Sequence, residues 1–204
     1  MLQAGLHNLR QASVRITEVS PRDGLQHESE FVPTLRKISL INALSRTGVT
    51  EIEAGSFVSP AAIPQLADSD EVLRAIDRIP GVTYSALVPN ERGLERARAA
   101  GVDKIAVFTA ASNSFTRHNI KATVQESLVR FRPIVAAAKR DGMAVRAYLS
   151  TVVFCPYEGR IAPTQVRDVM ERLLDLAVDD ISLGETVGKA SPTDIRRLLA
   201  TVLP

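Results

Sequence analysis

Short runs of apolar and β-branched residues alternate with longer amphipathic segments along this chain. Several of the short runs are apolar almost throughout, which is typical of parallel strands buried on both faces. The pattern predicts six strands, at Val14–Val19, Thr50–Ala54, Val82–Val88, Asp103–Thr109, Met143–Leu149 and Asp179–Leu183. An α/β protein with a parallel sheet is therefore expected.

The segments between these runs carry helix signals. Apolar residues recur at helical spacing over Pro33–Thr47, and Gly48 follows as a stop. The tetrapeptide Thr123-Val-Gln-Glu126 has the spacing of a capping box at the start of a long helix. Ser191-Pro192-Thr193-Asp194 combines an N-cap residue with proline at the first helical position. The order is strand then helix, six times over.

Two architectures fit this alternation. Successive strand starts lie about 33 residues apart, so six units use about 200 residues, whereas a closed (β/α)₈ barrel takes about 250. The chain is therefore either a complete six-stranded open sheet or a TIM barrel short of its last two βα units. No linker or shift in composition divides residues 1–204, so a single domain is expected. Periodicity alone does not choose between the two architectures.

Composition excludes several classes of protein. The 204 residues include 25 basic and 23 acidic side chains, and 45% are hydrophobic, as in an ordinary globular protein. One cysteine excludes a disulfide framework, and no apolar run is long enough to cross a membrane. A net charge of +2 forms no basic patch, so nucleic acid is not the expected partner. The segment Met1–Thr17 lacks acids, as a transit peptide would, but it is short; a cytoplasmic location is expected over a mitochondrial one.

Polar residues gather where the predicted strands end, the edge at which both architectures place functional groups. Arg22 and Asp23 follow the first strand, Glu53 ends the second and Glu185 follows the sixth. Alternation puts Glu51 and Glu53 on one face of their strand. Taken singly, each is explained by a local ion pair or a solvated carboxylate. Together they offer hard oxygen ligands and one guanidinium, which suit a divalent cation and an anionic substrate.

Five segments together resemble one enzyme family. They are Glu18–Gln26, Ile52–Pro60, Phe115–Ile120, Cys155–Gly159 and Ile181–Gly188, in this order along almost the whole chain. They resemble hydroxymethylglutaryl-CoA lyase, of the metal-dependent Claisen-type barrels. The resemblance implies a TIM barrel that cleaves 3-hydroxy-3-methylglutaryl-CoA, an acyl-CoA, to acetyl-CoA and acetoacetate. It also implies a bound Mg²⁺ or Mn²⁺ and a homodimer for the full-length enzyme.

The same resemblance implies roles for individual residues. Arg22 would stabilise the thioester enolate, Asp23 would bind the metal, and Glu53 and Glu185 would be catalytic. A guanidinium does not act as a base, so a fixed positive charge suits Arg22; an aspartate oxygen suits Mg²⁺ better than a thiolate does. The residues expected to bind substrate are Arg22, Gln26, Arg146, Tyr148 and Thr186.

The chain departs from the family pattern in two ways. The family's remaining metal ligands, a His-x-His pair and an Asn, have no counterpart here, since His7, His27 and His118 are isolated. We therefore expect an incomplete barrel in which residues 1–204 alone have little or no lyase activity. Glu185 also stands where the family usually has Asp.

Other interpretations remain open from the sequence. One is a related condensing synthase of the isopropylmalate, homocitrate or citramalate type. Another is a non-catalytic half-barrel that pairs with another barrel protein. For single residues, Cys155 is expected to be a buried thiol, and His27 and His118 are expected in loops after the first and fourth strands.

Overall fold

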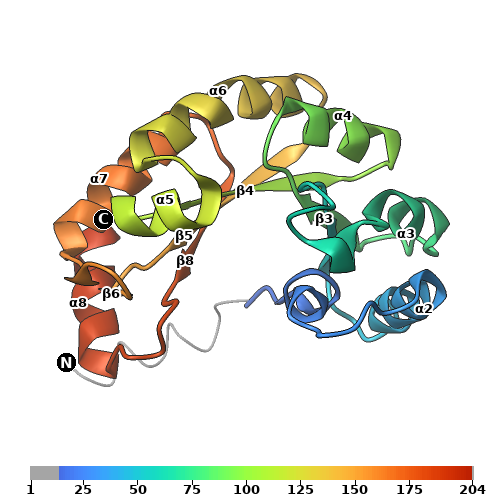
Figure 1. The fold of residues 1–204 in the computed structure, drawn as a ribbon, viewed down its shortest axis with the longest axis horizontal. Helices are drawn as coiled ribbons and strands as arrows, with labels where there is room; N and C mark the ends of the chain where they lie inside the picture. The colour runs from blue at the N-terminus through green and yellow to red at the C-terminus, as the bar shows by residue number, and fades with distance from the viewer. Residues whose placement is uncertain (1–13, 204) are drawn as a thin grey trace.

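The computed structural model describes residues 14–203 and contains one sheet of six parallel strands (Figure 1). Their order in the sheet follows the chain, without the reversal that marks a doubly wound open sheet. The strands are β1 (Thr17–Glu18), β2 (Glu51–Ser56), β3 (Thr83–Leu87), β4 (Lys104–Ala110), β5 (Ala144–Ser150) and β8 (Asp180–Gly184). This sequential order is that of a TIM barrel, and it decides between the two predicted architectures.

The helices form an arc along the outer side of the curved sheet (Figure 1). Those that follow the strands are α2 (Thr34–Leu44), α3 (Ser69–Ala75), α4 (Glu91–Ala99), α6 (Val124–Arg140), α7 (Pro163–Leu174) and α8 (Pro192–Val202). Shorter elements lie in the connections: η1 (Ser20–Gly24), η2 (Pro64–Leu66), α5 (Asn113–Ile120) and the β6–β7 hairpin (Phe154–Cys155, Gly159–Arg160). Helices on one face and six parallel strands make this part of the chain a half-barrel.

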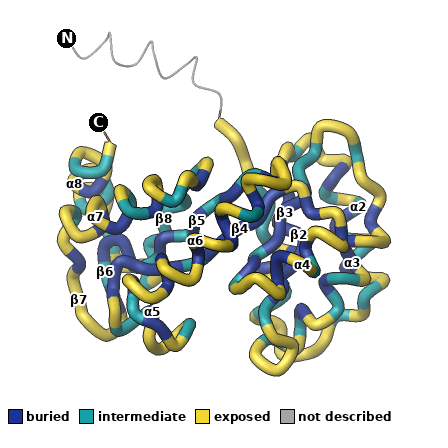
Figure 2. Tube along the Cα trace, turned by 90° about the horizontal axis from the view of Figure 1, so that it is seen from above, coloured by how far each residue is buried: buried dark blue, intermediate teal, exposed yellow. Residues whose placement is uncertain are grey.

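The hydrophobic core lies between the sheet and the helices. Ile52, Ile105 and Val145 are fully buried on the helix-facing side of their strands, against Val135 of α6 and Leu173 of α7 among others. Figure 2 shows buried residues along the central strands and exposed residues on the outer turns. Because side chains alternate along a strand, the neighbours of these core residues face the inside of the half-barrel.

The predicted elements are present, with their ends shifted by a few residues. Both predicted capping motifs are confirmed, since the Thr123 and Ser191 side chains accept hydrogen bonds from the N–H groups of Glu126 and Asp194. The predicted helix over Pro33–Thr47 ends earlier, at Leu44, and tight turns lead to Gly48, whose φ is +93°. The predicted first strand is the largest difference: it pairs only at Thr17–Glu18, because β2 begins opposite Thr17 and the chain turns into η1 at Ser20.

No helix in the described part of the chain is long and apolar enough to cross a membrane. Residues 1–13, which include His7 and most of the acid-free segment Met1–Thr17, lie outside the described range.

Candidate active site

Arg22 and Asp23 lie in η1, a single π-helical turn directly after β1. Pro21 occupies the start of the turn, and the Val19 carbonyl accepts hydrogen bonds from both Arg22 N (3.1 Å) and Asp23 N (2.7 Å). Single π turns are rare in proteins overall, but those that occur are often found at functional sites. This turn sets the two charged side chains next to each other at the carboxyl end of the sheet.

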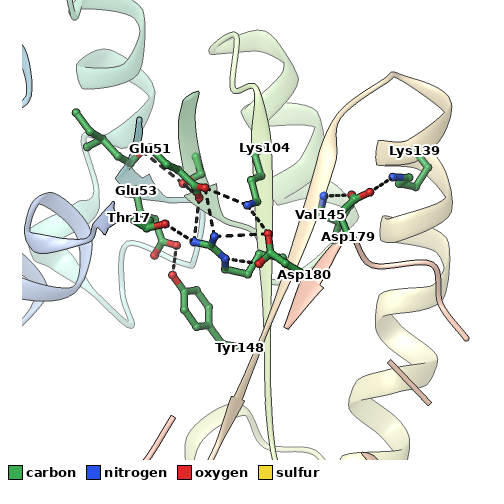
Figure 3. A network of polar contacts seen from close by, with 12 residues as sticks. Thr17, Glu51, Glu53, Lys104, Lys139, Val145, Tyr148, Asp179 and Asp180 are labelled. Carbon is green, nitrogen blue, oxygen red and sulfur yellow. Dashed lines mark hydrogen bonds and ion pairs between the residues drawn. The ribbon is translucent and has the colours of Figure 1, made fainter. Parts of the chain in front are cut away.

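The Arg22 guanidinium is held on three sides. Its Nε donates to Glu53 Oε1, its Nη1 donates to Asp23 Oδ1 at 2.6 Å, and its Cζ lies 5.5 Å from the centre of the Tyr148 ring. Glu53 is fully buried, and its other oxygen accepts a hydrogen bond from the Tyr148 hydroxyl at 2.6 Å (Figure 3). Arg22 itself is only 9% exposed. These contacts come from η1, β2 and β5, so three separate elements of the fold fix the guanidinium.

The charges of this cluster determine which groups are protonated. Burial alone would lower the pKa of Arg22, but the charges of Glu53 and Asp23 outweigh burial and raise it. Burial and the negative charge of Glu53 both raise the pKa of Tyr148. At neutral pH the site therefore presents a permanent cation, and the tyrosine hydroxyl remains a hydrogen-bond donor.

A cavity of about 1120 Å³ opens in front of this cluster. This volume is slightly above the usual range of about 300–1,000 Å³ for small-molecule sites. Four of the predicted site residues line it, namely Arg22, Asp23, Gln26 and Thr186. Much of the remaining wall is apolar, from Val58, Ile63, Leu87, Val88, Phe108, Phe115, Ile120 and Phe131. The cavity therefore combines the charged pair Arg22 and Asp23 with a largely apolar wall.

Two predicted residues lie elsewhere. Glu185 is not part of the cavity wall; its Oε2 accepts from Gly188 N at 2.5 Å within the loop after β8, and its Oε1 is buried without a partner in the described residues. Its neighbour Thr186 accepts from Thr151 N at 2.9 Å and does line the cavity. Arg146, expected at the substrate pocket, instead points into an ion-pair layer away from the cavity wall.

This ion-pair layer, made of Glu51, Lys104, Arg146 and Asp180, connects β2, β4, β5 and β8; Figure 3 shows its network of contacts. Lys104 Nζ lies 2.5 Å from Asp180 and 3.1 Å from Glu51, and Arg146 pairs with the same two acids. Arg146 also donates to the Thr17 hydroxyl at 3.1 Å. Sequence alternation predicted that Glu51 shares a face of its strand with Glu53, but the other three members of the layer come from β4, β5 and β8 and depend on the register of these strands.

The remaining singled-out residues are accounted for locally. His27 lines the cavity, with Nδ1 2.8 Å from the Asp23 carbonyl oxygen. His118 lies in α5, not in the predicted loop, and stacks on Tyr157. Cys155 is buried as predicted, with its Sγ 3.0 Å from Ser112 Oγ.

The described residues contain no cluster of acidic, histidine and cysteine side chains that could form a metal site by themselves. Within residues 14–203 no three His, Cys, Asp or Glu side chains lie close enough to share one. Asp23 is the acid among the cavity-lining residues, and its side chain is 50% exposed. This stretch therefore supplies at most one carboxylate to a coordination shell that needs several ligands.

Comparison with known proteins places this geometry in a family. The family model described as HMGL-like matches residues 13–203. The chain belongs to the HMGL-like family. Its half-barrel therefore corresponds to part of the TIM barrel of this family, in agreement with the solved structures that it resembles.

Individual HMGL-like proteins are similar over most of the chain. Hydroxymethylglutaryl-CoA lyase, mitochondrial, from Bos taurus is 48% identical over 93% of this chain. The crystal structure of the HMG-CoA lyase from Brucella melitensis is 50% identical, with a TM-score of 0.92 over 93% of this chain and 67% of that one. An HMG-CoA lyase from Acinetobacter baumannii, solved in complex with coenzyme A and 3-methylmalate, is 39% identical, with a TM-score of 0.89 over 93% of this chain and 62% of that one. The chain spans 58% of the length of the bovine relative.

Proposed function

We propose that this chain carries the thioester-binding part of a hydroxymethylglutaryl-CoA lyase, which cleaves 3-hydroxy-3-methylglutaryl-CoA to acetyl-CoA and acetoacetate. The observation that carries the proposal is the Arg22 guanidinium, fixed by Glu53, Asp23 and Tyr148 at the wall of a cavity of about 1120 Å³. Its membership of the HMGL-like family and its similarity to lyases support the same conclusion.

The role proposed for Arg22 follows from the guanidinium nitrogen that its described neighbours leave unpaired. When the carbon–carbon bond breaks, the electron pair moves into the acetyl thioester and negative charge develops on its carbonyl oxygen. Arg22 Nε and Nη1 are occupied, whereas Nη2 makes no hydrogen bond to any described residue. A cation already held in place costs no reorganisation when that charge appears. We assign Nη2 as the donor to the enolate oxygen.

The family implies a divalent ion, Mg²⁺ or Mn²⁺, that would stabilise negative charge on the substrate's hydroxyl oxygen. Asp23 is the residue of this chain proposed to contact it. Residues 14–203 contain no complete ligand set for such an ion.

The proposed partner of the cavity is an acyl-CoA. The coenzyme A bound to the similar lyase from Acinetobacter baumannii supports this choice, as does the apolar wall that leads away from Arg22. Gln26 and Thr186 are proposed as polar contacts to the acyl group. Glu53 is proposed to act by holding Arg22, and Glu185 by shaping the loop that presents Thr186.

Three properties of the complete enzyme are also proposed: a single catalytic barrel domain, a homodimer and a cytoplasmic location. A relative named as a cytoplasmic lyase, from Danio rerio and 48% identical, supports the location, although mitochondrial relatives are equally similar.

A chimaeric enzyme tests the proposed function. Residues 14–203 of this chain are joined to the part of the Brucella melitensis lyase that they do not match, and release of acetyl-CoA and acetoacetate from 3-hydroxy-3-methylglutaryl-CoA is measured with Mg²⁺. We expect turnover, and we expect Arg22→Lys to lower kcat/KM by about 10²- to 10³-fold, the usual effect of removing one oxyanion donor.

The matched control is Arg36→Lys, an exposed arginine of α2, which should leave the rate unchanged. Cleavage that is insensitive to Arg22→Lys would contradict the role of Arg22. Condensation of an acyl-CoA with a keto acid, without cleavage, would identify a synthase instead.

A further inference from the structure

Glu53 has no oxygen left for a substrate. It is 0% exposed, one oxygen is taken by Arg22 Nε and the other by the Tyr148 hydroxyl at 2.6 Å. A buried carboxylate needs both interactions, because its desolvation is costly otherwise. The Glu53 carboxylate therefore connects Arg22 and Tyr148. The hydrogen bond from the Tyr148 hydroxyl restrains the carboxylate, and the carboxylate in turn restrains the Arg22 guanidinium.

Tyr148 contacts this link at two points. Its hydroxyl binds Glu53, and its ring lies under the Arg22 guanidinium, with Cζ 5.5 Å from the ring centre. Tyr148 does not belong to the cavity wall, unlike Arg22 and Asp23. Its surroundings keep the phenol protonated at neutral pH, because burial and the charge of Glu53 raise its pKa. At neutral pH the Tyr148 hydroxyl is therefore available as a hydrogen-bond donor to Glu53.

We infer that Tyr148 is a positioning residue, which fixes the direction of the Arg22 guanidinium through Glu53 without touching the substrate. This inference rests on the proposed function for the part that concerns the reaction. It differs from the substrate-binding role expected from sequence, which would place the hydroxyl in the cavity.

The two roles predict different kinetics for Tyr148→Phe in the chimaeric enzyme. This change keeps the ring and removes only the hydroxyl. Misplacing a group by about 1 Å costs on the order of 10²-fold in rate, so a positioning role predicts a fall in kcat of about 10- to 100-fold with KM within about twofold. Tyr157→Phe is the matched control; this tyrosine is 53% exposed, and removing its hydroxyl should change neither constant.

A double-mutant cycle isolates the path through Glu53. If Tyr148 acts only through this carboxylate, Tyr148→Phe should cost less than about threefold in a Glu53→Gln background, because coupled groups are not additive. Losses that multiply in full, or a rise in KM without a fall in kcat, would overturn the inference.

A measurement that needs no activity separates this inference from the proposed function. In the ¹⁵N-labelled 204-residue chain, the Arg22 Nε–H proton is protected by Glu53, and we expect Tyr148→Phe to speed its exchange with solvent at least tenfold, with no change in Tyr157→Phe. Unchanged exchange in Tyr148→Phe overturns the positioning role, whether or not the chimaeric enzyme is a lyase. Faster exchange in an inactive chimaera supports the positioning role and rejects the function.

Discussion

The charged residues inside the half-barrel are tolerated because each has an opposite charge beside it. Lys104 is 4% exposed and Glu51 is 2% exposed, yet both belong to the ion-pair layer of Glu51, Lys104, Arg146 and Asp180. Removing one partner of a buried pair leaves the other uncompensated, which costs more than the pair contributes. A single substitution in this layer should therefore destabilise the fold.

The pH dependence of stability tests this layer at Asp180. Burial alone would raise the pKa of this carboxyl, but the hydrogen bonds and charges of Arg146 and Lys104 outweigh burial and lower it. A lowered folded-state pKa stabilises the fold above the unfolded value near 3.8, and this contribution is lost as the pH falls through the folded pKa. Because the side chain is 37% exposed, we expect Asp180→Asn to cost about 1 kcal/mol at pH 7, after allowance for screening by solvent.

Urea unfolding of the wild type and Asp180→Asn between pH 7 and pH 3 measures this difference, which should shrink toward zero below pH 4. Asp168→Asn, at an exposed residue of α7, serves as control and should show no such trend. A difference that stays constant with pH would show that Asp180 does not contribute through its charge.

At the residue scale, the sequence predicted which residues gather but not how they pair. Arg22, Asp23 and Glu53 were expected together because each ends or follows a strand, and the structure brings them into contact. Arg146 was expected at the pocket, whereas its inward position one layer below Tyr148 gives it Asp180 and Glu51 as partners. Such pairings depend on register between strands, which no local pattern encodes.

Among the elements, β2 contains an irregularity that matters for the site. Its register against β3 shifts between Glu53 and Gly55, so Ala54 is an extra residue on this strand. Such a bulge re-aims the side chains around it. Immediately after it, Ser56 N donates to the Ser69 hydroxyl at 3.0 Å, which ties the end of β2 to α3.

Gly55→Ala should disturb this connection. A Cβ at this position would lie 2.9 Å from Ser69 Oγ, and Ser69 cannot move freely because its hydroxyl also binds the Leu66 carbonyl at 2.8 Å. Overpacking of this kind costs about 1–3 kcal/mol, which thermal or urea unfolding would detect. Gly24→Ala is the control, since its Cβ would meet Ser20 Cβ at an ordinary 3.4 Å. Equal stabilities for the two variants would contradict the close approach at Gly55.

The sequence predicted the long elements and missed the short ones. Strands β2, β3, β4, β5 and β8 were found because each has five or more residues, enough for a clear pattern; β1 has two residues and was predicted too long. The β6–β7 hairpin has two residues in each strand, too few for any period, although Pro156 and Gly159 mark a turn. The π turn η1 was expected as a plain loop, because Ser-Pro-Arg-Asp-Gly has the composition of one.

For the whole molecule, the two outer strands of the sheet are β1 and β8, and a side chain connects them. Arg146 reaches from β5 to Thr17 on β1 while it pairs with Asp180 on β8. The inside of the half-barrel is thus cross-linked by polar contacts, but among the described residues Asp23 is the one acid in the cavity wall.

This arrangement predicts weak metal binding by the 204-residue chain alone. We expect its affinity for Mn²⁺ to be at least about 100-fold below that of the chimaeric enzyme, since loss of even supporting groups around a metal costs 10- to 100-fold. Electron paramagnetic resonance of free Mn²⁺ measures both. Tight binding of Mn²⁺ by residues 1–204 would mean that this chain holds ligands beyond Asp23.

The same comparison predicts the activity of the 204-residue chain. Because residues 14–203 offer no complete set of metal ligands, cleavage of 3-hydroxy-3-methylglutaryl-CoA by this chain should stay below about 1% of that of the chimaera, as expected when a catalytic metal is lost. Release of acetyl-CoA at a comparable rate would contradict this expectation.

The π turn of Ser20–Gly24 also constrains how this protein can change in length. Each residue rotates the chain by about 100° in an α-helix and by somewhat less in a π turn, so deleting or inserting one residue in this pentapeptide would swing either the guanidinium or the neighbouring carboxylate out of the cavity. The sheet and its helices would still assemble, because η1 contributes little to their core. Insertions and deletions here would therefore leave a well-folded protein that has lost its chemistry.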